Sequence, residues 1–325
     1  MKIRDIISRN RPSVSFEIFP PKRHDPSRIG DGEAKAAMER TKEVVRKIAA
    51  ERPAFISVTY GAAGGTTGAN TAAIAQFVQD ECHIPALAHL TCITSTRDKI
   101  ADEIASFREK GIENILCLRG DYPPEKRDQG SGIRDQGAFQ HAIDLVRACR
   151  SSSLIPDPRS LIPDPRSLIP DPSSLCLGGA CYPERHPECA HLDEDIAHLK
   201  EKVDAGLDFL TTQMFFDNNV YFHYLARLRD AGITIPVLAG IMPVTNGRQI
   251  TRICALSGTS LPPRFRAIVD RVGDNPAAML DAGVAYATEQ IIDLFANGVN
   301  NVHVYTMNKP EIAIRIMLNL HGLIA

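Results

Sequence analysis

Eight short apolar segments rich in β-branched residues recur along the chain, and stretches with helical periodicity separate them. The expected strands are residues 14–19, 55–60, 86–91, 114–119, 175–182, 208–213, 235–240 and 301–306. Between them, residues 33–50, 96–111, 193–206 and 218–232 show the 3.6-residue apolar period or the composition of a helix. Strands that alternate with helices form a parallel sheet, because each parallel connection needs a crossover.

The number of strands favours a closed barrel over an open sheet. Eight parallel strands close a (β/α)8 TIM barrel. An open doubly wound sheet that binds a dinucleotide would carry Gly-x-Gly-x-x-Gly after the first strand, but that strand runs into "FPPK". The Gly-rich residues 61–68 follow the second strand with a different spacing. Four expected helices end in the glycine of an αβ loop, namely Gly111, Gly206, Gly232 and Gly298. We therefore predict an α/β TIM barrel that forms one domain over residues 1–325.

One tract does not fit the alternation. Residues 153–174, "SLIPDPRSLIPDPRSLIPDPSS", hold three near-identical copies of a seven-residue unit. With two prolines per copy, the tract supplies neither a helix nor a strand. It lies between the fourth helix, at residues 139–150, and the fifth strand. We interpret it as a tandem-repeat surface loop, inserted on the face of the barrel opposite the carboxyl ends of the strands. The alternative is a Pro-rich motif that docks onto a partner.

Composition and charge exclude several classes of protein. The formal net charge is −2 and the basic residues are scattered, so the sequence predicts no basic surface that would bind nucleic acid or an acidic membrane. The first residues contain no apolar run long enough for a signal peptide or a membrane span. Eight cysteines in 325 residues do not make a disulfide framework, so we expect a reduced, cytoplasmic protein.

Four residues could be drawn as a zinc site: Cys176, Cys181, His186 and Cys189. They lack a C-x-x-C spacing, and Cys176 and Cys181 are five residues apart in one expected strand. This separation puts their side chains on opposite faces. We therefore predict no metal, and interpret these cysteines as buried thiols.

Function in a TIM barrel lies at the carboxyl ends of the strands, and nearly every expected strand here ends in polar residues. In "VSFEIF", alternation puts Val14, Phe16 and Ile18 on one face and Glu17 on the other. Since the apolar face packs against helices, Glu17 is expected to face the barrel mouth. A carboxyl desolvated there would have a raised pKa and could act as a general acid. The alternative is a buried ion pair, for example with Arg119.

Other strand ends offer groups for a ligand. "LRGDYPP" places Arg119 and Asp121 around Gly120, which suits a ligand with phosphates or a heterocycle, although a salt-bridged turn is the alternative. "YPERHPE" makes His186 available after the fifth strand. The next helix puts Asp195 and Lys202 on one stripe, where a lone lysine is usually solvated.

Taken together, these segments resemble a known family. "SFEIFPPK", "ISVTYGAAGGT", "AHLTC", "LRGDYPP", "CYPERHPE", "LKEKVDAGLDFLTTQMFFD", "GIMPVTN" and "HVYTMN" occur in order, and the chain resembles the flavin-dependent methylenetetrahydrofolate reductases over most of residues 12–320. The resemblance implies a TIM barrel with non-covalent FAD and ping-pong kinetics. NADH or NADPH would reduce the flavin, and 5,10-methylenetetrahydrofolate would then receive the hydride and give 5-methyltetrahydrofolate.

The resemblance also implies roles for individual residues. Glu17 resembles the general acid and Asp121 the carboxylate between flavin and pterin, so both are expected to be catalytic and to contact the substrate. The positions that match cofactor contacts are Thr59, Tyr60, His89, Arg119, Gly120, Asp121, His141, Ala142, Ala180, Tyr182, His186, Asp195 and Lys202. The positions that match the substrate side are Gln213, Gln249, Tyr305 and Lys309.

The chain departs from the family pattern in places. Lys309 stands where arginine is usual in the family. Lysine keeps the positive charge but cannot bind a substrate carboxylate through two hydrogen bonds as a guanidinium does. The match at His141 and Ala142 is less secure, because the preceding loop differs in length. The chain ends at Ala325, just after the last expected helix, so we expect no C-terminal regulatory domain.

We expect a homo-oligomer that binds small molecules and neither nucleic acid nor membrane. The sequence does not determine the number of subunits or the preferred pyridine nucleotide. Two alternatives stay open: another FAD-dependent TIM-barrel oxidoreductase, or a catalytically silent barrel with a Pro-rich docking loop.

Overall fold

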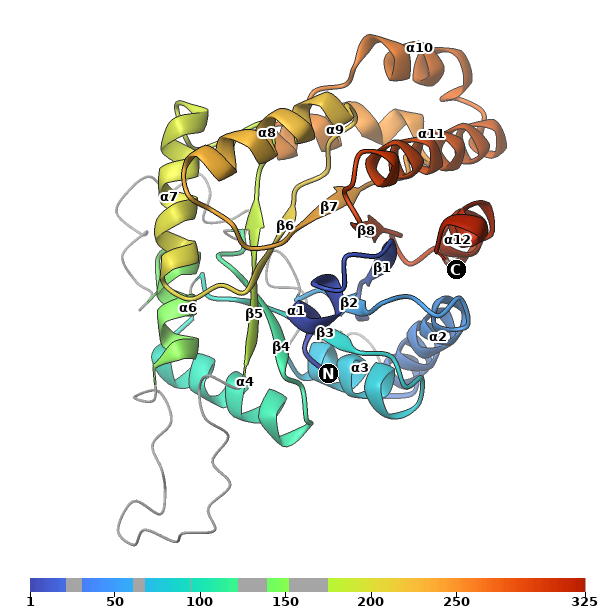
Figure 1. The fold of residues 1–325 in the computed structure, drawn as a ribbon. Coiled ribbons are helices and arrows are strands. Elements are labelled where there is room, and N and C mark those ends of the chain that lie inside the picture. Colours follow the sequence, from blue (N-terminus) through green and yellow to red (C-terminus); the bar gives the residue numbers. More distant parts are fainter. Residues whose placement is uncertain (22–30, 61–67, 94, 122–138, 152–174, 325) are drawn as a thin grey trace, which may run out of the picture.

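The computed structural model describes residues 1–21, 31–60, 68–93, 95–121, 139–151 and 175–324, and its strands form a closed parallel barrel (Figure 1). The strands follow one another around the barrel in chain order, and β1 pairs with β8 to close it. They are β1 (Ser13–Ile18), β2 (Ile56–Val58), β3 (Ala86–Thr91), β4 (Asn114–Leu118), β5 (Cys176–Cys181), β6 (Phe209–Thr212), β7 (Val237–Ile241) and β8 (Asn301–Tyr305). This confirms the predicted (β/α)8 fold.

The helices surround the barrel, as the ribbon in Figure 1 shows. They are α1 (Ile3–Ile7), α2 (Asp31–Ala49), α3 (Gly68–Asp80), α4 (Arg97–Glu109), α6 (Ala142–Arg150), α7 (Leu192–Asp204), α8 (Asn218–Asp230), α9 (Gly247–Ser257), α10 (Pro263–Val272), α11 (Pro276–Ala296) and α12 (Pro310–Ile324). Side chains cap several of them. The Thr96 hydroxyl accepts a hydrogen bond from Lys99 N, and the Asp217 carboxylate accepts one from Asn219 N. The four predicted helix-ending glycines all have positive φ, a region that favours glycine.

Alternation along β1 sorts its side chains into two environments. Val14, Phe16 and Ile18 lie in the main hydrophobic core between the barrel and its helices. Ser15 and Glu17 face the barrel interior, where Ser15 Oγ lies 2.8 Å from Nδ1 of His303 on β8. The predicted orientation of Glu17 toward the interior is confirmed.

The amino-terminal end of the barrel is closed by a second, smaller apolar cluster, which we call the floor. It contains Ile3, Ile7, Phe55, Leu87, Leu116, Cys176, Phe209 and Leu238, none of them more than 5% exposed. Two of its members come from α1, a helix that the sequence analysis did not predict. One buried polar residue, Asn114 at the start of β4, lies at this layer, where its Oδ1 accepts a hydrogen bond from Ile3 N of α1 at 2.9 Å.

One arginine holds the described residues on either side of the tract at 153–174. Arg150, the last residue of α6, donates from Nη1 to Leu175 O and from Nη2 to the Asp208 carboxylate, at 2.8 and 2.7 Å. The same carboxylate accepts hydrogen bonds from Leu177 N and from Arg4. The repeat tract itself lies outside the described residues. Its neighbours on both sides are fixed to the barrel.

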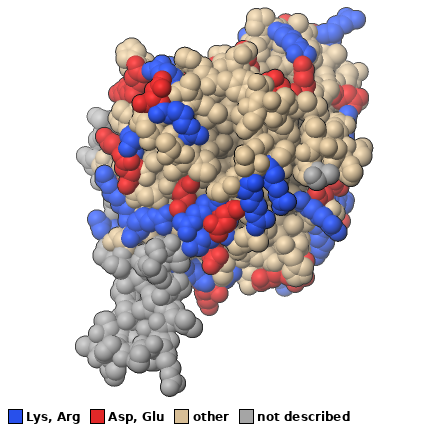
Figure 2. Space-filling model, viewed as in Figure 1, with Lys and Arg blue, Asp and Glu red and all other residues tan. Residues whose placement is uncertain are grey.

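Charged side chains of both signs are interspersed on the face drawn in Figure 2, and a broad uncharged area covers its upper part. Within the described part of the chain, no helix combines the length and the apolar character needed to cross a membrane.

Candidate active site at the carboxyl ends of the strands

Glu17 lies near the carboxyl end of β1, inside the barrel mouth. Its side chain is 12% exposed, and its Oε2 lies 3.7 Å from Nε2 of His89, which is 6% exposed and belongs to β3. The strand register places Glu17 beside Ser57 of β2 on one side and beside Tyr305 of β8 on the other. A carboxyl and an imidazole from strands that are distant in sequence thus share one desolvated space.

Burial shifts both groups of this pair toward their neutral forms. Desolvation raises the pKa of Glu17 to about 8, and it lowers the pKa of His89 to about 3. At neutral pH the pair is therefore a protonated carboxyl beside a neutral imidazole, and not an ion pair. The ion pair between Glu17 and Arg119, the alternative left open by the sequence, is not formed.

Arg119, at the end of β4, pairs instead with Glu188 in the loop after β5. Both guanidinium Nη atoms donate to the carboxylate, at 2.5 and 2.8 Å. Gly120 follows with a φ of +84°, and a Cβ there would lie 2.9 Å from Cβ of Thr91. The backbone thus passes close to β3 in a conformation that favours glycine. Asp121 is exposed next to this turn.

The end of β5 and the start of α7 form a second polar group at the mouth. The rings of Tyr182 and His186 meet edge to face, with centroids 4.7 Å apart. Asp195, in the first turn of α7, accepts a hydrogen bond from His186 N at 2.9 Å. Lys202 is half-buried, and its Nζ donates to Ala180 O at 2.6 Å. Desolvation lowers the pKa of this lysine, which therefore differs from the solvated lysine that is usual on such a helix stripe.

Some buried polar atoms at the mouth have no hydrogen-bond partner among the described residues. They are Thr59 Oγ1 after β2, Thr211 Oγ1 on β6 and His89 Nε2 on β3. Beside them, Tyr60 donates from its hydroxyl to Glu103 at 3.1 Å. Buried polar atoms are almost always paired in folded proteins, so this group indicates a place where a polar ligand binds.

The remaining predicted residues also lie at this end of the barrel. His141 and Ala142 form the start of α6, where Asp144 accepts from His141 N. Tyr305 reaches across the mouth and donates to Thr212 O at 2.6 Å. The other three follow strands β6 to β8 in the chain: Gln213 comes after β6, Gln249 is exposed in the first turn of α9, and Lys309, after β8, donates to Thr245 Oγ1 at 2.7 Å.

Sequence reasoning missed four polar residues of this region: Ser57, Glu188, Thr211 and His303. Ser57, Thr211 and His303 lie inside strands, in the same alternating positions as Glu17, so the interior register could have identified them. Glu188 had no such signal, because its pairing with Arg119 joins two loops.

Cys176 and Cys181, which the alternation predicted to lie on opposite faces of their strand, are separated in the structure. Cys176 belongs to the floor, whereas Cys181 packs in the core on the outer side of the barrel. Burial raises the pKa of Cys176 to about 11 and that of Cys181 to about 12, so both stay thiols.

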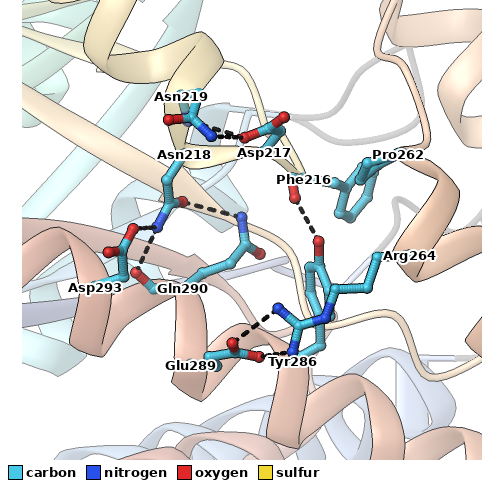
Figure 3. Close-up of a pocket in the computed structure, with 10 residues that line it drawn as sticks. All are labelled: Phe216, Asp217, Asn218, Asn219, Pro262, Arg264, Tyr286, Glu289, Gln290 and Asp293. Atoms are coloured by element: carbon cyan, nitrogen blue, oxygen red, sulfur yellow. Dashed lines mark hydrogen bonds and ion pairs between the residues drawn. The ribbon is translucent and has the colours of Figure 1, made fainter.

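A hollow of about 370 Å³ lies elsewhere, between the start of α8, α10 and α11 (Figure 3). Its polar side chains are mostly paired with one another: Arg264 forms a bidentate pair with Glu289, and Asn218 donates to Asp293. None of the predicted site residues, all of which the structure describes, lines this hollow. We therefore place the candidate site at the barrel mouth.

The family model of methylenetetrahydrofolate reductase matches residues 2–321. The chain belongs to the methylenetetrahydrofolate reductase family. It is 32% identical to methylenetetrahydrofolate reductase (NADH) 1 of Arabidopsis thaliana over 332 residues, which cover 99% of this chain and 50% of that protein. It is 30% identical to the 5,10-methylenetetrahydrofolate reductase of Escherichia coli K12 over 305 residues, which cover 94% of this chain and 89% of that protein. The chain thus spans about half the length of the plant methylenetetrahydrofolate reductases and nearly all of the bacterial one.

Solved structures agree with the barrel of this reductase family. An uncharacterized protein from Clostridium thermocellum that binds two copies of 5-methyl-5,6,7,8-tetrahydrofolic acid superposes with a TM-score of 0.61. It is 15% identical and covers 98% of both chains. Oxaloacetate acetylhydrolase, 11% identical with a TM-score of 0.53, covers 100% of this chain and 88% of its own. At these identities the likeness concerns the fold alone.

Proposed function

We propose that this protein reduces 5,10-methylenetetrahydrofolate to 5-methyltetrahydrofolate with NADH or NADPH, through FAD bound non-covalently at the barrel mouth. The observation that carries the proposal is Glu17, a carboxyl that burial keeps protonated near neutral pH at the carboxyl end of β1. Family membership and the folate bound by the Clostridium thermocellum protein support the choice of substrate.

The residues at the mouth fit a flavin. The unpartnered hydroxyls of Thr59 and Thr211 offer hydrogen bonds, Gly120 allows close approach of a ligand to the backbone, and Arg119 supplies a cation suited to a diphosphate. The residues proposed to hold the cofactor are Thr59, Tyr60, His89, Arg119, Gly120, Asp121, His141, Ala142, Ala180, Tyr182, His186, Asp195 and Lys202. When bound, FAD accepts a hydride from NAD(P)H and passes it to the folate.

Glu17 supplies the proton that opening of the folate ring requires. In that step a carbon–nitrogen bond of the five-membered ring breaks, the Glu17 proton moves to the departing nitrogen, and the carbon is left as an iminium that accepts hydride. A group with a pKa of about 8 is mostly protonated at pH 7 and still acidic enough to give up its proton. Solvent restores that proton before the next turnover.

Five residues are proposed to hold the folate beside Glu17: Asp121, Gln213, Gln249, Tyr305 and Lys309. Lys309 offers a point charge for a substrate carboxylate, and its hydrogen bond to Thr245 directs its amine. Tyr305 keeps its proton, because burial raises its pKa well above the usual value. Asp121 adds an exposed carboxylate at the end of β4.

The test compares the wild-type protein with Glu17→Gln in two half-reactions. We expect both purified proteins to show a flavin spectrum and to oxidise NAD(P)H with menadione as acceptor. Only the wild type should oxidise NAD(P)H with methylenetetrahydrofolate, because glutamine keeps the shape of the side chain but has no acidic proton. Equal folate turnover in both proteins would remove Glu17 from the mechanism, and a yellow wild-type protein that ignores the folate would favour another flavin-dependent reaction.

A further inference from the structure

The chain leaves β8 through two consecutive residues whose backbone lies in the left-handed region. Met307 has a φ of +54° and Asn308 a φ of +58°. Residues other than glycine rarely adopt this conformation, and asparagine does so more readily than methionine. Residues held in this region often belong to functional sites. Here the pair lies between Tyr305 and Lys309, two of the residues proposed to hold the folate.

Side chains of this turn take the place of the β8 backbone as partners of β1. The two strands pair in register as far as Glu17 and Tyr305. Beyond that point, Thr306 Oγ1 donates to Glu17 O at 2.7 Å. The amide of Asn308 pairs with both backbone groups of Phe19: Oδ1 accepts from Phe19 N at 2.7 Å, and Nδ2 donates to Phe19 O at 2.8 Å. The residues at the end of β1 therefore stay hydrogen-bonded to this part of the chain although β8 has ended.

The double pairing with Phe19 requires the amide of asparagine. It needs a donor and an acceptor on one short side chain, whereas an aspartate would present only acceptors. The backbone of Asn308 is held by the turn itself, in which Lys309 N donates to Thr306 O at 3.0 Å. Phe19 is 37% exposed and is not a member of the buried core. The two hydrogen bonds from Asn308 therefore fix a segment whose ring lies at the surface.

Asn308 thereby connects two groups that the proposed reaction needs at a fixed spacing. Its partner Phe19 follows Glu17 by two residues, and its own neighbour in the chain is Lys309. The amine of Lys309 is directed by its hydrogen bond to Thr245 Oγ1, at 2.7 Å. In the proposed complex, Glu17 protonates a nitrogen of the folate ring system, and Lys309 binds a carboxylate at the other end of the same molecule. A bound substrate reacts efficiently only when its contacts hold the reacting atoms in place.

We propose that Asn308 is a positioning residue, which keeps the strand that bears Glu17 and the turn that bears Lys309 at the spacing that one folate molecule spans. Asn308 acts on the reaction only through these two groups. Without the pairing, folate held at one end would be displaced at the other, and both its binding and its protonation would suffer. The kinetic role rests on the proposed function, whereas the pairing with Phe19 can be measured without it.

Asn308→Gly tests this role, because glycine adopts a φ of +58° without strain and lacks only the amide. In the full-length flavin-bound protein, we expect kcat/KM for methylenetetrahydrofolate to fall roughly tenfold, as the loss of two hydrogen bonds predicts, with a higher KM and a lower kcat. Turnover of NAD(P)H with menadione, measured on the same preparation, should stay at the wild-type value. A variant that is merely misfolded or short of flavin would lose both activities in the same proportion, and that result would refute the role.

Met307→Gly is the matched control. It relieves the same backbone conformation one residue earlier in the turn, at a methionine that is 45% exposed and carries no amide side chain. We expect this variant to keep the wild-type kinetics in both assays. An equal loss of folate turnover in the two variants would show that the conformation of the turn matters and the amide does not. Unchanged folate kinetics in Asn308→Gly would also refute the role of Asn308.

Hydrogen–deuterium exchange measures the pairing without any assay of activity. A peptide that covers residues 15–21 reports on the amide of Phe19, since Pro20 and Pro21 carry no backbone N–H. We expect this amide to exchange faster in Asn308→Gly than in the wild type and in Met307→Gly. Equal exchange in all three proteins would overturn the pairing, whatever their activities. A protected amide in a wild-type protein without folate turnover would instead overturn the proposed function, and the kinetic role with it.

Discussion

The carboxyl that is proposed to drive the reaction should also weaken the fold. Burial raises the pKa of Glu17 from 4.5 to about 8 in the folded protein, whereas in the unfolded chain the group keeps its ordinary value. Between these two values the folded state holds a proton that the unfolded state has released. Folding therefore takes up a proton, and stability falls as the pH rises through this window. Below the window both states are protonated, and above it the loss is constant.

The loss of unfolding free energy can be calculated from the pKa shift of Glu17. With about 1.4 kcal/mol per pKa unit, the free energy of unfolding at pH 7 is lowered by roughly 3 kcal/mol relative to a neutral side chain. At pH 5 the same calculation gives roughly 1 kcal/mol, and at pH 8 roughly 4 kcal/mol. Glu17→Gln replaces the carboxyl with a neutral side chain of the same shape. It should therefore be the more stable protein, by a margin that grows with pH.

Thermal unfolding of the wild type and Glu17→Gln at pH 5, 7 and 8 measures this margin. We expect the midpoint of the variant to exceed that of the wild type by roughly 5 °C or more at pH 7, and by much less at pH 5. Glu201→Gln, at an exposed position of α7, is the control and should show no pH-dependent margin. The same margin at all three pH values, or a less stable Glu17→Gln at pH 8, would refute the reasoning.

Three other changes test separate parts of the site. In Gly240→Ala the new methyl carbon would clash with the backbone oxygen of Thr212 and lie 2.6 Å from the hydroxyl of Tyr305. We therefore expect a loss of roughly 1–3 kcal/mol in unfolding free energy and a higher KM for folate. Gly32→Ala, with open space around it, should cause neither change. Lys309→Arg restores a bidentate fork and should lower the KM for methylenetetrahydrofolate without changing kcat in steady-state assays, whereas an unchanged KM would mean that Lys309 does not bind the substrate carboxylate. Deletion of residues 154–172 should leave turnover and the unfolding midpoint unchanged, since the flanking residues are held by Arg150, and loss of turnover would show that the tract serves the reaction.

Much of the architecture could be predicted from local pattern. The alternation of short strands and helices predicted the barrel, and the two-residue period of β1 predicted that Glu17 faces its interior. Burial alone then accounts for the raised pKa of that carboxyl. Each of these conclusions depends on residues close together in the chain.

What could not be predicted depends on pairings between distant residues. Ser15 meets His303 only because β1 closes the barrel against β8, and Arg119 meets Glu188 across two loops. The floor was missed because α1 is five residues long, too short for a helical period to show. The hydrogen bond of Lys202 could not be predicted from its own helix, because its acceptor is the backbone of β5.

The floor bears on how Glu17 is reprotonated in the proposed reaction. Among the described residues, α1 and the apolar side chains of the floor fill one end of the barrel, so in the proposed reaction cofactor, folate and the water that returns a proton to Glu17 would all enter from the other end. The proposal then predicts that a bound folate blocks the route by which the Glu17 carboxylate regains its proton. On this proposal, protonation of Glu17 and binding of folate alternate in each turnover.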